Sequence, residues 1–377
     1  MEINFLLVLL MTVATVNLAE GEEPEKKASV LLTEFGQFEG KPVTVYTMTN
    51  KNGMVARITD YGGVVVSLLA PDRNGKMEDV VLGYNTFAEY EADSGWYGAI
   101  VGRNANRIKA DKFKIDGKEY QLATNNGPNN LHGGVKGFNK KLWKGTASIQ
   151  SGEPKLKLEY VSPDGEEGFP GNLTVTTTYT ITKDNALKIE YQATTDQPTV
   201  CNLTHHSYWN IAGPTSKTIT SQELQLSCDG YNPIDDTGIP TGEVQPVIGT
   251  AFDFRQPKLV GKDIDADDDQ LAKGKGYDHN FAINGEPGKL RPVAKLYDPK
   301  SGRVMEVSST DYGVQLYSGN WFDGSVVGRT GKFEHRTALC LECQHFPDSV
   351  NQPNFKSAVL RPGETYQKTT VYRFSVK

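Results

Sequence analysis

The chain has 377 residues, of which 37% are hydrophobic and 23% are charged, a composition typical of a soluble globular protein. Its formal net charge of -6 gives it no electrostatic attraction to nucleic acid or to an anionic membrane surface, so neither is expected as a partner. The length fits one large β domain or two ordinary domains, and small molecules remain the candidate ligands.

The first residues differ in character from the rest of the chain. An apolar run extends from Phe5 to Met11, and the small residues Ala19 and Gly21 precede a charged stretch. This pattern predicts a secretory signal peptide over residues 1–21, although Glu2 stands where a basic residue is preferred. The alternative is an uncleaved membrane anchor, but the run is shorter than the roughly 20 apolar residues that span a bilayer. We therefore expect a secreted protein with no membrane association in its mature form.

The pattern after residue 32 has a period of two. Apolar and polar residues alternate over residues 43–49, 155–160, 173–182 and 186–191, which places one face of each expected strand in a core. Turn signals such as Asp-Gly and Asn-Gly separate these runs, and no βαβ alternation or glycine-rich phosphate loop is present. The sequence therefore predicts an all-β fold, a large antiparallel β-sandwich.

The organisation expected from this pattern is simple. A flexible segment over residues 22–32 precedes a single domain over residues 33–377. The best helical candidate is short, over residues 86–92, and the acidic residues 263–269 are expected to form a solvated loop.

Four cysteines, Cys201, Cys228, Cys340 and Cys343, allow three pairings in an oxidising compartment. Cys340 and Cys343 have CxxC spacing, but a redox motif of that type needs a cysteine at a helix start, and these residues lie in an expected strand. We expect buried thiols or one long-range disulfide.

Two segments match the pattern for N-glycosylation. Asn172 follows a Pro-Gly turn and is a plausible acceptor, which would make the protein a glycoprotein. Asn202 lies beside the histidines discussed next and is expected to be buried and unmodified.

Five segments carry residues suited to chemistry, and each also has an ordinary structural explanation. The first two are Gly102-Arg-Asn-Ala-Asn-Arg107 and Asn129-Asn-Leu-His132-Gly-Gly134. Asn106 and Arg107 could donate hydrogen bonds to hydroxyl oxygens, or the segment could be a turn with exposed charges. His132 beside two glycines has an uncrowded ring, although a loop histidine that bonds a backbone carbonyl is the commoner case.

The third segment is Asn202-Leu-Thr-His-His-Ser-Tyr-Trp-Asn210. In a strand His205 and His206 point to opposite faces, so only one of them can enter a given site. Tyr208 and Trp209 offer an aromatic surface that suits the apolar face of a sugar. The alternative is an aromatic core strand with one histidine in a structural role.

The last two segments contain carboxylates. Asp278, in Gly276-Tyr-Asp-His-Asn-Phe281, could accept hydroxyl protons or orient a histidine, although Asp-His-Asn could also be a turn. Glu342 interrupts an apolar strand, Leu339-Cys-Leu-Glu-Cys-Gln344. A carboxylate buried there must be paired or must rise in pKa, which suits a general base, whereas on an edge strand it would face water.

Together and in this order, these segments resemble the motifs of the aldose 1-epimerase (galactose mutarotase) family. Further matching segments lie at residues 163–171, 313–320, 346–355 and 360–364, and the resemblance covers residues 33–377 in a plant-like form. It implies a β-sandwich that opens and recloses the ring of a free hexose, such as galactose or glucose, without a metal or a cofactor. The expected partner is the sugar alone, bound by a monomer or a weak dimer.

The resemblance also implies roles for particular residues. Glu342 takes the proton of the anomeric hydroxyl, His206 protonates the ring oxygen from the opposite side of the ring, and His132 supports the developing charge. Four residues bind ring hydroxyls: Asn106, Arg107, Asp278 and Gln315. The chain departs from the family pattern at Cys343, which is usually Thr, and at His205, which is often Asn or Gln.

Other functions fit parts of the pattern. An isomerase on the same scaffold could act on a lactol of a specialised metabolite, and a phosphosugar epimerase is a related possibility. A sugar-binding protein without turnover would not need an acid–base pair. A metal hydrolase could use His132, His206 and Glu342 as zinc ligands, although no two histidines have the i, i+4 spacing of a helical zinc site.

Overall fold

The computed structural model describes residues 27–93 and 95–377, so the expected signal peptide over residues 1–21 lies outside the described part of the chain. Three sheets form most of the fold, and their strand pairs are all antiparallel. The prediction of an all-β antiparallel sandwich is confirmed. In the described residues no helix is long and apolar enough to cross a membrane.

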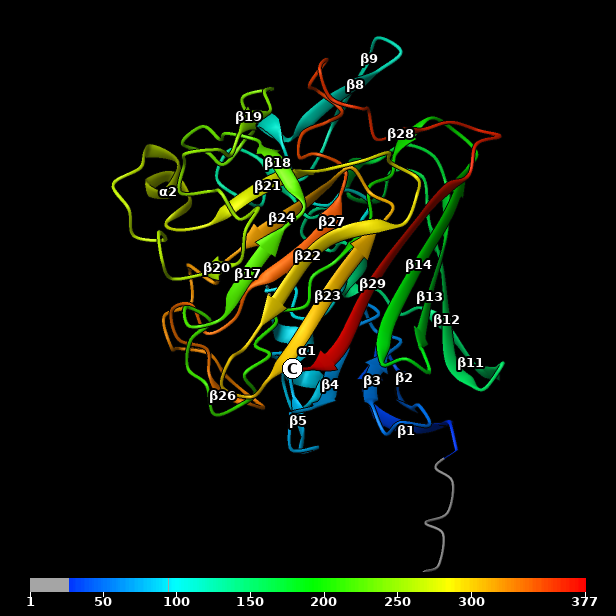
Figure 1. Ribbon diagram of the computed structural model, residues 1–377. Helices are drawn as coiled ribbons and strands as arrows, with labels where there is room; N and C mark the ends of the chain where they lie inside the picture. The colour runs from blue at the N-terminus through cyan, green and yellow to red at the C-terminus, as the bar shows by residue number, and fades with distance from the viewer. Residues whose placement is uncertain (1–26, 94) are drawn as a thin grey trace, which may run out of the picture.

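A nine-stranded sheet forms the broad layer at the front of Figure 1. In spatial order its strands are β11 (Lys144–Gln150), β12 (Glu153–Ser162), β13 (Leu173–Ile181), β14 (Ala186–Thr195), β29 (Tyr366–Val376), β23 (Arg303–Ser309), β22 (Arg291–Tyr297), β17 (Glu223–Leu226) and β20 (Lys258–Leu259). The alternation read from the sequence is the burial pattern of these strands: in β12, Leu156 and Leu158 are fully buried while Lys157 is exposed. The C-terminal strand β29 lies between β14 and β23 and so joins the two halves of the sheet.

Two five-stranded sheets complete the main architecture. The first contains β1 (Ser29–Phe38), β2 (Lys41–Thr49), β3 (Val55–Thr59), β4 (Val65–Pro71) and β5 (Met77–Asp79) in that order. The second has the order β19 (Gln245–Pro246), β18 (Cys228–Tyr231), β21 (Asp278–Ile283), β24 (Gly313–Tyr317) and β27 (Cys340–Gln344).

Five pairs of short strands lie outside these three sheets. They are β6 (Ile100–Val101) with β16 (Thr204–His205), β7 (Arg107–Ile108) with β10 (Asn130–Leu131), β8 (Lys112–Ile115) with β9 (Lys118–Gln121), β15 (Thr199–Val200) with β28 (Val359–Leu360), and β25 (Val327–Gly328) with β26 (Gly331–Lys332). The β8–β9 turn has Asp116 and Gly117 at positive φ, which explains why Asp-Gly marks this hairpin in the sequence.

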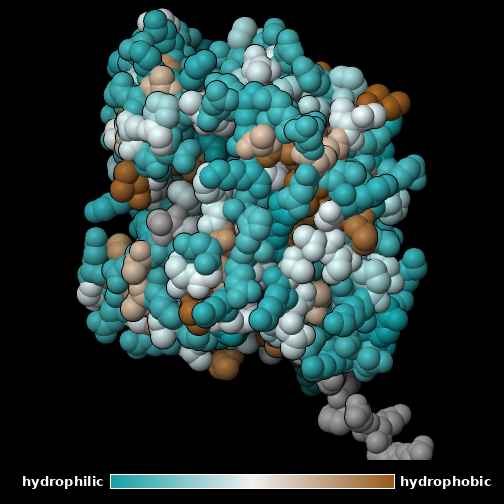
Figure 2. Space-filling view, turned by 90° about the vertical axis from the view of Figure 1, so that its left-hand side faces the viewer, coloured by the Kyte–Doolittle hydropathy of each residue, from teal (hydrophilic) through white to brown (hydrophobic). Residues whose placement is uncertain are grey.

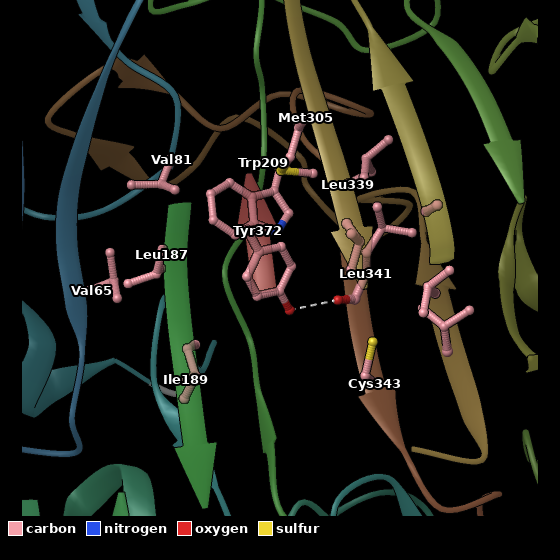
Figure 3. Close-up of a cluster of buried hydrophobic side chains, with 14 of the residues drawn as sticks. Val65, Val81, Leu187, Ile189, Trp209, Met305, Leu339, Leu341, Cys343 and Tyr372 are labelled. Carbon is pink, nitrogen blue, oxygen red and sulfur yellow. Dashed lines mark hydrogen bonds between the residues drawn. The ribbon is translucent and has the colours of Figure 1, made fainter. Parts of the chain in front are cut away.

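The main core lies between the nine-stranded sheet and the other two sheets. Figure 3 shows Tyr372 of β29 packed against Trp209, with their ring centroids 4.8 Å apart and the ring planes tilted by 37°, and facing Leu341 of β27. The Tyr372 hydroxyl donates to the Leu341 carbonyl at 2.9 Å. This packing fixes the position of β27, the strand that carries Glu342.

Helices are few and short. The expected helix is α1 (Phe87–Ala92), which begins with a capping box between Thr86 and Glu89. The sequence did not predict α2 (Asp269–Gly274), whose Asp268 cap belongs to the acidic region. Residues 263–267 form no helix or strand, as expected, but the predicted acidic loop over residues 263–269 is wrong at its end, because Asp268 caps α2 and Asp269 begins it.

The N-terminal boundary of the fold differs from the expectation. Strand β1 begins at Ser29, which pairs with Thr49, so residues 29–32 belong to the sheet and not to the flexible segment predicted over residues 22–32. The reason is that backbone pairing holds this strand while its side chains stay exposed: Leu31 is 62% and Leu32 is 53% exposed. A strand of this kind shows no apolar alternation.

The cysteines are buried thiols in the structure, with no disulfide among the four. Asn202 is also fully buried, as expected, and Asn172 is exposed. Figure 2 shows a face that is mainly hydrophilic, with hydrophobic residues in small separate groups.

Candidate active site

The predicted site residues meet in one open pocket of about 490 Å³. Its walls come from the second five-stranded sheet and from segments on both sides of it in the sequence, over residues 95–97, 106–132, 206–208 and 321–322. All seven predicted residues line it: Asn106, Arg107, His132, His206, Asp278, Gln315 and Glu342.

Strand register brings three of these residues together. Gln315 on β24 lies directly opposite Glu342 on β27, so both side chains project from the same face of the sheet. Asp278 begins the neighbouring strand β21, two residues before the partner of Gln315, and therefore shares that face. Asp-His-Asn is thus the start of a strand and not a turn. Glu342 is only 2% exposed although β27 ends the strand order, so it does not face water as an edge residue would.

The two adjacent histidines point in opposite directions, as expected. His206 follows β16 and lines the pocket, whereas His205 points away from it and contacts Ser207 Oγ through Nε2 at 2.7 Å. Only His206 can take part in chemistry in this pocket.

Loop geometry places His132 and Asn106. Both have positive φ, 52° and 63° respectively. A Cβ on Gly133 would lie 2.0 Å from the Gly102 carbonyl oxygen, so this backbone approach requires glycine after His132. Asn106 N–H donates to His132 Nδ1 at 3.2 Å, which joins the two loops. In the same segment Arg103 is buried, not exposed, and binds Ser162 and the Pro163 and Pro170 carbonyls.

His206 and Glu342 form the central pair. Nε2 of His206 lies 3.5 Å from Oε1 of Glu342. Burial lowers the pKa of His206 to about 4. Burial and the nearby Asp278 raise the pKa of Glu342 well above its usual value, while Arg107 opposes that rise. Over a wide pH range the pair therefore holds one proton, either on the carboxyl or on the imidazole.

The spacing of this pair differs from the expectation of an acid and a base on opposite sides of a sugar ring. The two groups lie side by side, too close to enclose a ring. The anomeric oxygen and the ring oxygen of a sugar are bonded to the same carbon, so an acid and a base that serve them must be neighbours. Glu342 Oε2 is buried without a hydrogen-bond partner among the described residues, and it is free to accept from a ligand hydroxyl.

His132 is fixed as a neutral donor. Its Nδ1 accepts the Asn106 N–H, so a neutral ring carries its proton on Nε2. Burial lowers the pKa of His132 well below its usual value, and His206 and Arg107 add to that effect. The ring lies edge-on to His206, with centroids 5.0 Å apart. His132 can therefore offer an N–H to a ligand oxygen.

A second polar group is centred on Asp278. Gln315 donates to its Oδ1 at 2.7 Å, and Arg107 Nη2 lies 3.5 Å from its Oδ2. Asn126 accepts from Arg107 Nε at 3.0 Å and so orients the guanidinium. The Gln315 Oε1 atom is buried and has no hydrogen-bond partner within the described residues. This group presents both donors and acceptors, as hydroxyl recognition requires.

Aromatic residues cover the rest of the pocket, and here the sequence analysis was partly wrong. Tyr208 lines the pocket as expected, but Trp209 is fully buried in the core shown in Figure 3. Strand-like alternation explains the difference: Tyr208 shares the face of His206, and Trp209 shares that of His205. The side chains of the pocket that the sequence analysis did not assign to a site include Trp96, Tyr97, Asn126, Tyr317, Trp321 and Phe322.

The zinc alternative can be tested against the same contacts. His132, His206 and Glu342 place ligand-type atoms within 4.8 Å of one another. A metal-bound histidine needs an unprotonated nitrogen. Nδ1 of His132 accepts a backbone N–H and Nε2 then carries the proton, so neither nitrogen is free to bind zinc. The residues do not fit a three-ligand zinc site.

Comparisons with known proteins agree with this geometry. A family model described as aldose 1-epimerase matches residues 44–373. The chain is 44% identical over 351 residues to the galactose mutarotase of Homo sapiens, a match that covers 93% of this chain and 99% of that protein. It is 35% identical over 338 residues to the aldose 1-epimerase of Escherichia coli, covering 89% and 96% of the two chains.

The chain belongs to the aldose 1-epimerase family.

Solved structures of this family share the fold. A galactose 1-epimerase from Lactobacillus acidophilus superposes with a TM-score of 0.82 at 27% identity, covering 93% of this chain and 99% of that one. An aldose epimerase homologue from C. elegans gives a TM-score of 0.79 at 31% identity, with 92% and 99% covered. The pocket of Glu342 and His206 therefore lies in a fold that the aldose 1-epimerase family shares.

Proposed function

We propose that this protein is an aldose 1-epimerase, an isomerase that interconverts the α and β anomers of free hexoses such as galactose and glucose. The observation that carries the proposal is the buried pair of Glu342 and His206, 3.5 Å apart, in a pocket lined by hydroxyl-binding and aromatic side chains. Family membership supports the same reaction.

The reaction needs two proton transfers and one broken bond. Glu342, as carboxylate, takes the proton of the anomeric hydroxyl while imidazolium His206 gives its Nε2 proton to the ring oxygen. The bond between C1 and the ring oxygen breaks and C1 becomes an aldehyde. Rotation about the C1–C2 bond exposes the other face of the aldehyde, and the ring recloses as both protons return. Each positioned proton-transfer group contributes on the order of 10²- to 10⁴-fold to the rate.

The remaining residues hold the sugar in place. His132 donates its Nε2 proton near the ring oxygen, where negative charge develops. Asp278, Arg107 and Gln315 bind ring hydroxyls, and Trp96 and Tyr208 supply aromatic faces for the apolar side of the sugar. The backbone N–H of Asn106 donates to Nδ1 of His132 and so holds the His132 ring in place.

Polarimetry with a panel of substrates tests the function. The protein is added to freshly dissolved α-D-galactose, α-D-glucose and a lactol without ring hydroxyls, and the first-order decay of rotation is followed. Acceleration for the hexoses supports the proposal. Acceleration for the lactol alone would favour the metabolite isomerase. Binding of galactose without any acceleration would identify a sugar-binding protein and overturn the proposal.

We also propose that the protein is a secreted, plant-like member of the family. The support for secretion is the apolar run from Phe5 to Met11 with small residues before Glu22, together with the exposed acceptor Asn172, whereas the plant-like assignment rests on the resemblance of the motifs alone. N-terminal sequencing of the protein from its native source should find cleavage near Gly21, and a glycosidase should reduce its mass. An intact Met1 terminus would contradict secretion by this route.

For the oligomeric state we propose a monomer or a weak dimer. The hydrophobic residues on the face in Figure 2 are dispersed, unlike the continuous apolar patch of a stable interface. Light scattering coupled to size exclusion should give the mass of one chain, 41.5 kDa for the uncleaved protein and less after signal cleavage, or a concentration-dependent dimer. A stable higher oligomer would contradict this proposal.

A further inference from the structure

Cys340 contacts His206, the proposed acid, on the side of the imidazole ring that faces away from Glu342. Its Sγ lies 3.5 Å from Nδ1 of His206, the ring nitrogen opposite the one that faces Glu342. Cys340 precedes Glu342 by two residues on β27, so the two side chains project from the same face of the strand. Cys340 is fully buried and does not line the pocket.

The contacts of His206 make Cys340 the partner of Nδ1. Glu342 meets Nε2, and three other rings pack around the imidazole: Tyr208 at 4.8 Å, His132 at 5.0 Å and Trp96 at 6.4 Å between centroids. Among the described residues Cys340 is the side chain that lies within hydrogen-bond distance of Nδ1, and a hydrogen bond to the backbone of His206 itself also acts on the ring and favours its protonated form. Burial raises the pKa of the Cys340 thiol well above its usual value, so it meets His206 as a neutral group.

A thiol differs chemically from the usual partner of a catalytic histidine. Catalytic histidines are commonly oriented by a carboxylate or a backbone carbonyl, which stabilises the imidazolium. A neutral thiol is a weak donor and a weak acceptor, so it orients the ring but stabilises the charged form only slightly. The ring oxygen of a sugar is a weak base, and its protonation requires a strong acid.

We propose that Cys340 is a positioning residue for His206: it directs Nε2 toward the sugar ring oxygen while offering the imidazolium only a weak acceptor. The inference rests on the proposed epimerase function. Burial lowers the pKa of His206 to about 4, and the hydrogen bond to its own backbone opposes that shift only in part.

Two substitutions and one control separate this role from a merely structural one. Cys340→Ala removes the partner of Nδ1, and Cys340→Ser replaces it by a stronger acceptor of similar size. The control is Cys343→Ala, because Cys343 is also buried on β27 but projects from the opposite face of the strand, into the core cluster of Figure 3. Each variant is measured for kcat and KM on α-D-galactose by polarimetry, and for the pKa of His206 by NMR of its imidazole.

We expect Cys340→Ala to lower kcat by about fivefold to tenfold, the effect of one neutral hydrogen bond, with KM changed by less than about twofold. The pKa of His206 should rise in the order Ala, Cys, Ser, and the acid limb of the kcat profile should move with it. Cys343→Ala should leave that limb where it is in the wild type.

Either of two results would overturn the inference: an unchanged His206 pKa in both Cys340 variants, or equal changes in Cys340→Ala and Cys343→Ala. If Cys340→Ala does not fold, the direction of the shift in Cys340→Ser decides. A wild-type protein that is inactive on sugars would refute the proposed function, whereas the NMR comparison would still test the contact between Cys340 and His206.

Discussion

Nε2 of His206 lies 3.5 Å from Oε1 of Glu342, and the two side chains are only 5% and 2% exposed. Burial favours the neutral form of each group, because it raises the pKa of Glu342 and lowers that of His206. The form that can react carries the same single proton, but on the imidazole instead of the carboxyl. One proton transfer within the pair therefore prepares it for catalysis, and this relationship leads to the following predictions.

The rate should have a bell-shaped dependence on pH. At low pH a second proton enters the pair, and since the pKa of His206 is lowered to about 4, the acid limb should lie near pH 4. At high pH the pair loses its only proton, and the raised pKa of Glu342 moves this limb upward from the usual carboxyl range. Stopped-flow polarimetry between pH 3 and pH 10 measures both limbs. A flat profile would exclude the pairing.

Glu342→Gln should stabilise the folded protein at alkaline pH. The pKa of Glu342 is raised above its unfolded value of 4.5, so its contribution to stability is fully present below that pH and is lost as pH rises through the folded pKa. A glutamine has no such loss. Urea unfolding should show nearly equal free energies of unfolding for variant and wild type at pH 4.5, and a more stable variant at pH 8.

A matched control for this stability effect is Glu190→Gln, which alters an exposed carboxylate 2.7 Å from Lys188. The pH dependence of unfolding should be close to that of the wild type in the control. If Glu342→Gln behaves like the control, Glu342 is not held in a desolvated state.

Asp278→Asn should weaken sugar binding more than turnover. The substitution removes a charged acceptor that is shared by Gln315 and Arg107. Hydrogen bonds to charged groups contribute about 1.5–3 kcal/mol, so kcat/KM should fall roughly 10- to 100-fold, mainly through KM. The control is Asp253→Asn, which removes the 2.7 Å pair with Arg255 outside the pocket. Equal kinetics for Asp278→Asn and wild type would remove Asp278 from the binding group.

Removal of metal ions should leave the activity unchanged. Nδ1 of His132 accepts a backbone N–H, so the ring has no unprotonated nitrogen to offer a metal. The test is polarimetry after exhaustive dialysis against EDTA, with and without added zinc. A loss of activity that zinc restores would contradict the assigned tautomer and favour the hydrolase-like centre.

Much of the fold could be predicted because burial alternates along the strands. Leu156 and Leu158 show this in β12, and Thr86 with Glu89 shows the capping signal of α1. Strand β1 and helix α2 could not be predicted in the same way. Backbone pairing determines β1 while Leu31 and Leu32 stay exposed, and α2 is a six-residue helix whose cap lies within a run of acidic residues.

Part of the candidate site could also be predicted from the sequence. The resemblance of the short motifs indicated Glu342 and His206, and strand alternation predicted that only one of His205 and His206 would enter the pocket, which is His206. The same alternation, continued from His206 to Trp209, would have placed Trp209 on the face of His205 and therefore in the core. Trp96 and Cys340 gave no signal of their own, because their positions beside His206 depend on how a loop and a neighbouring strand pack around it.

The most direct test of the central claim is the catalysed mutarotation of α-D-galactose by wild type, Glu342→Gln, His206→Asn and the double variant. If Glu342 and His206 act as one base and one acid, each single variant should lose about 10²- to 10⁴-fold in kcat, and the double variant should lose less than the product of the two. Thermal unfolding of each variant verifies that it is folded. Wild-type rates in both folded single variants would contradict the account.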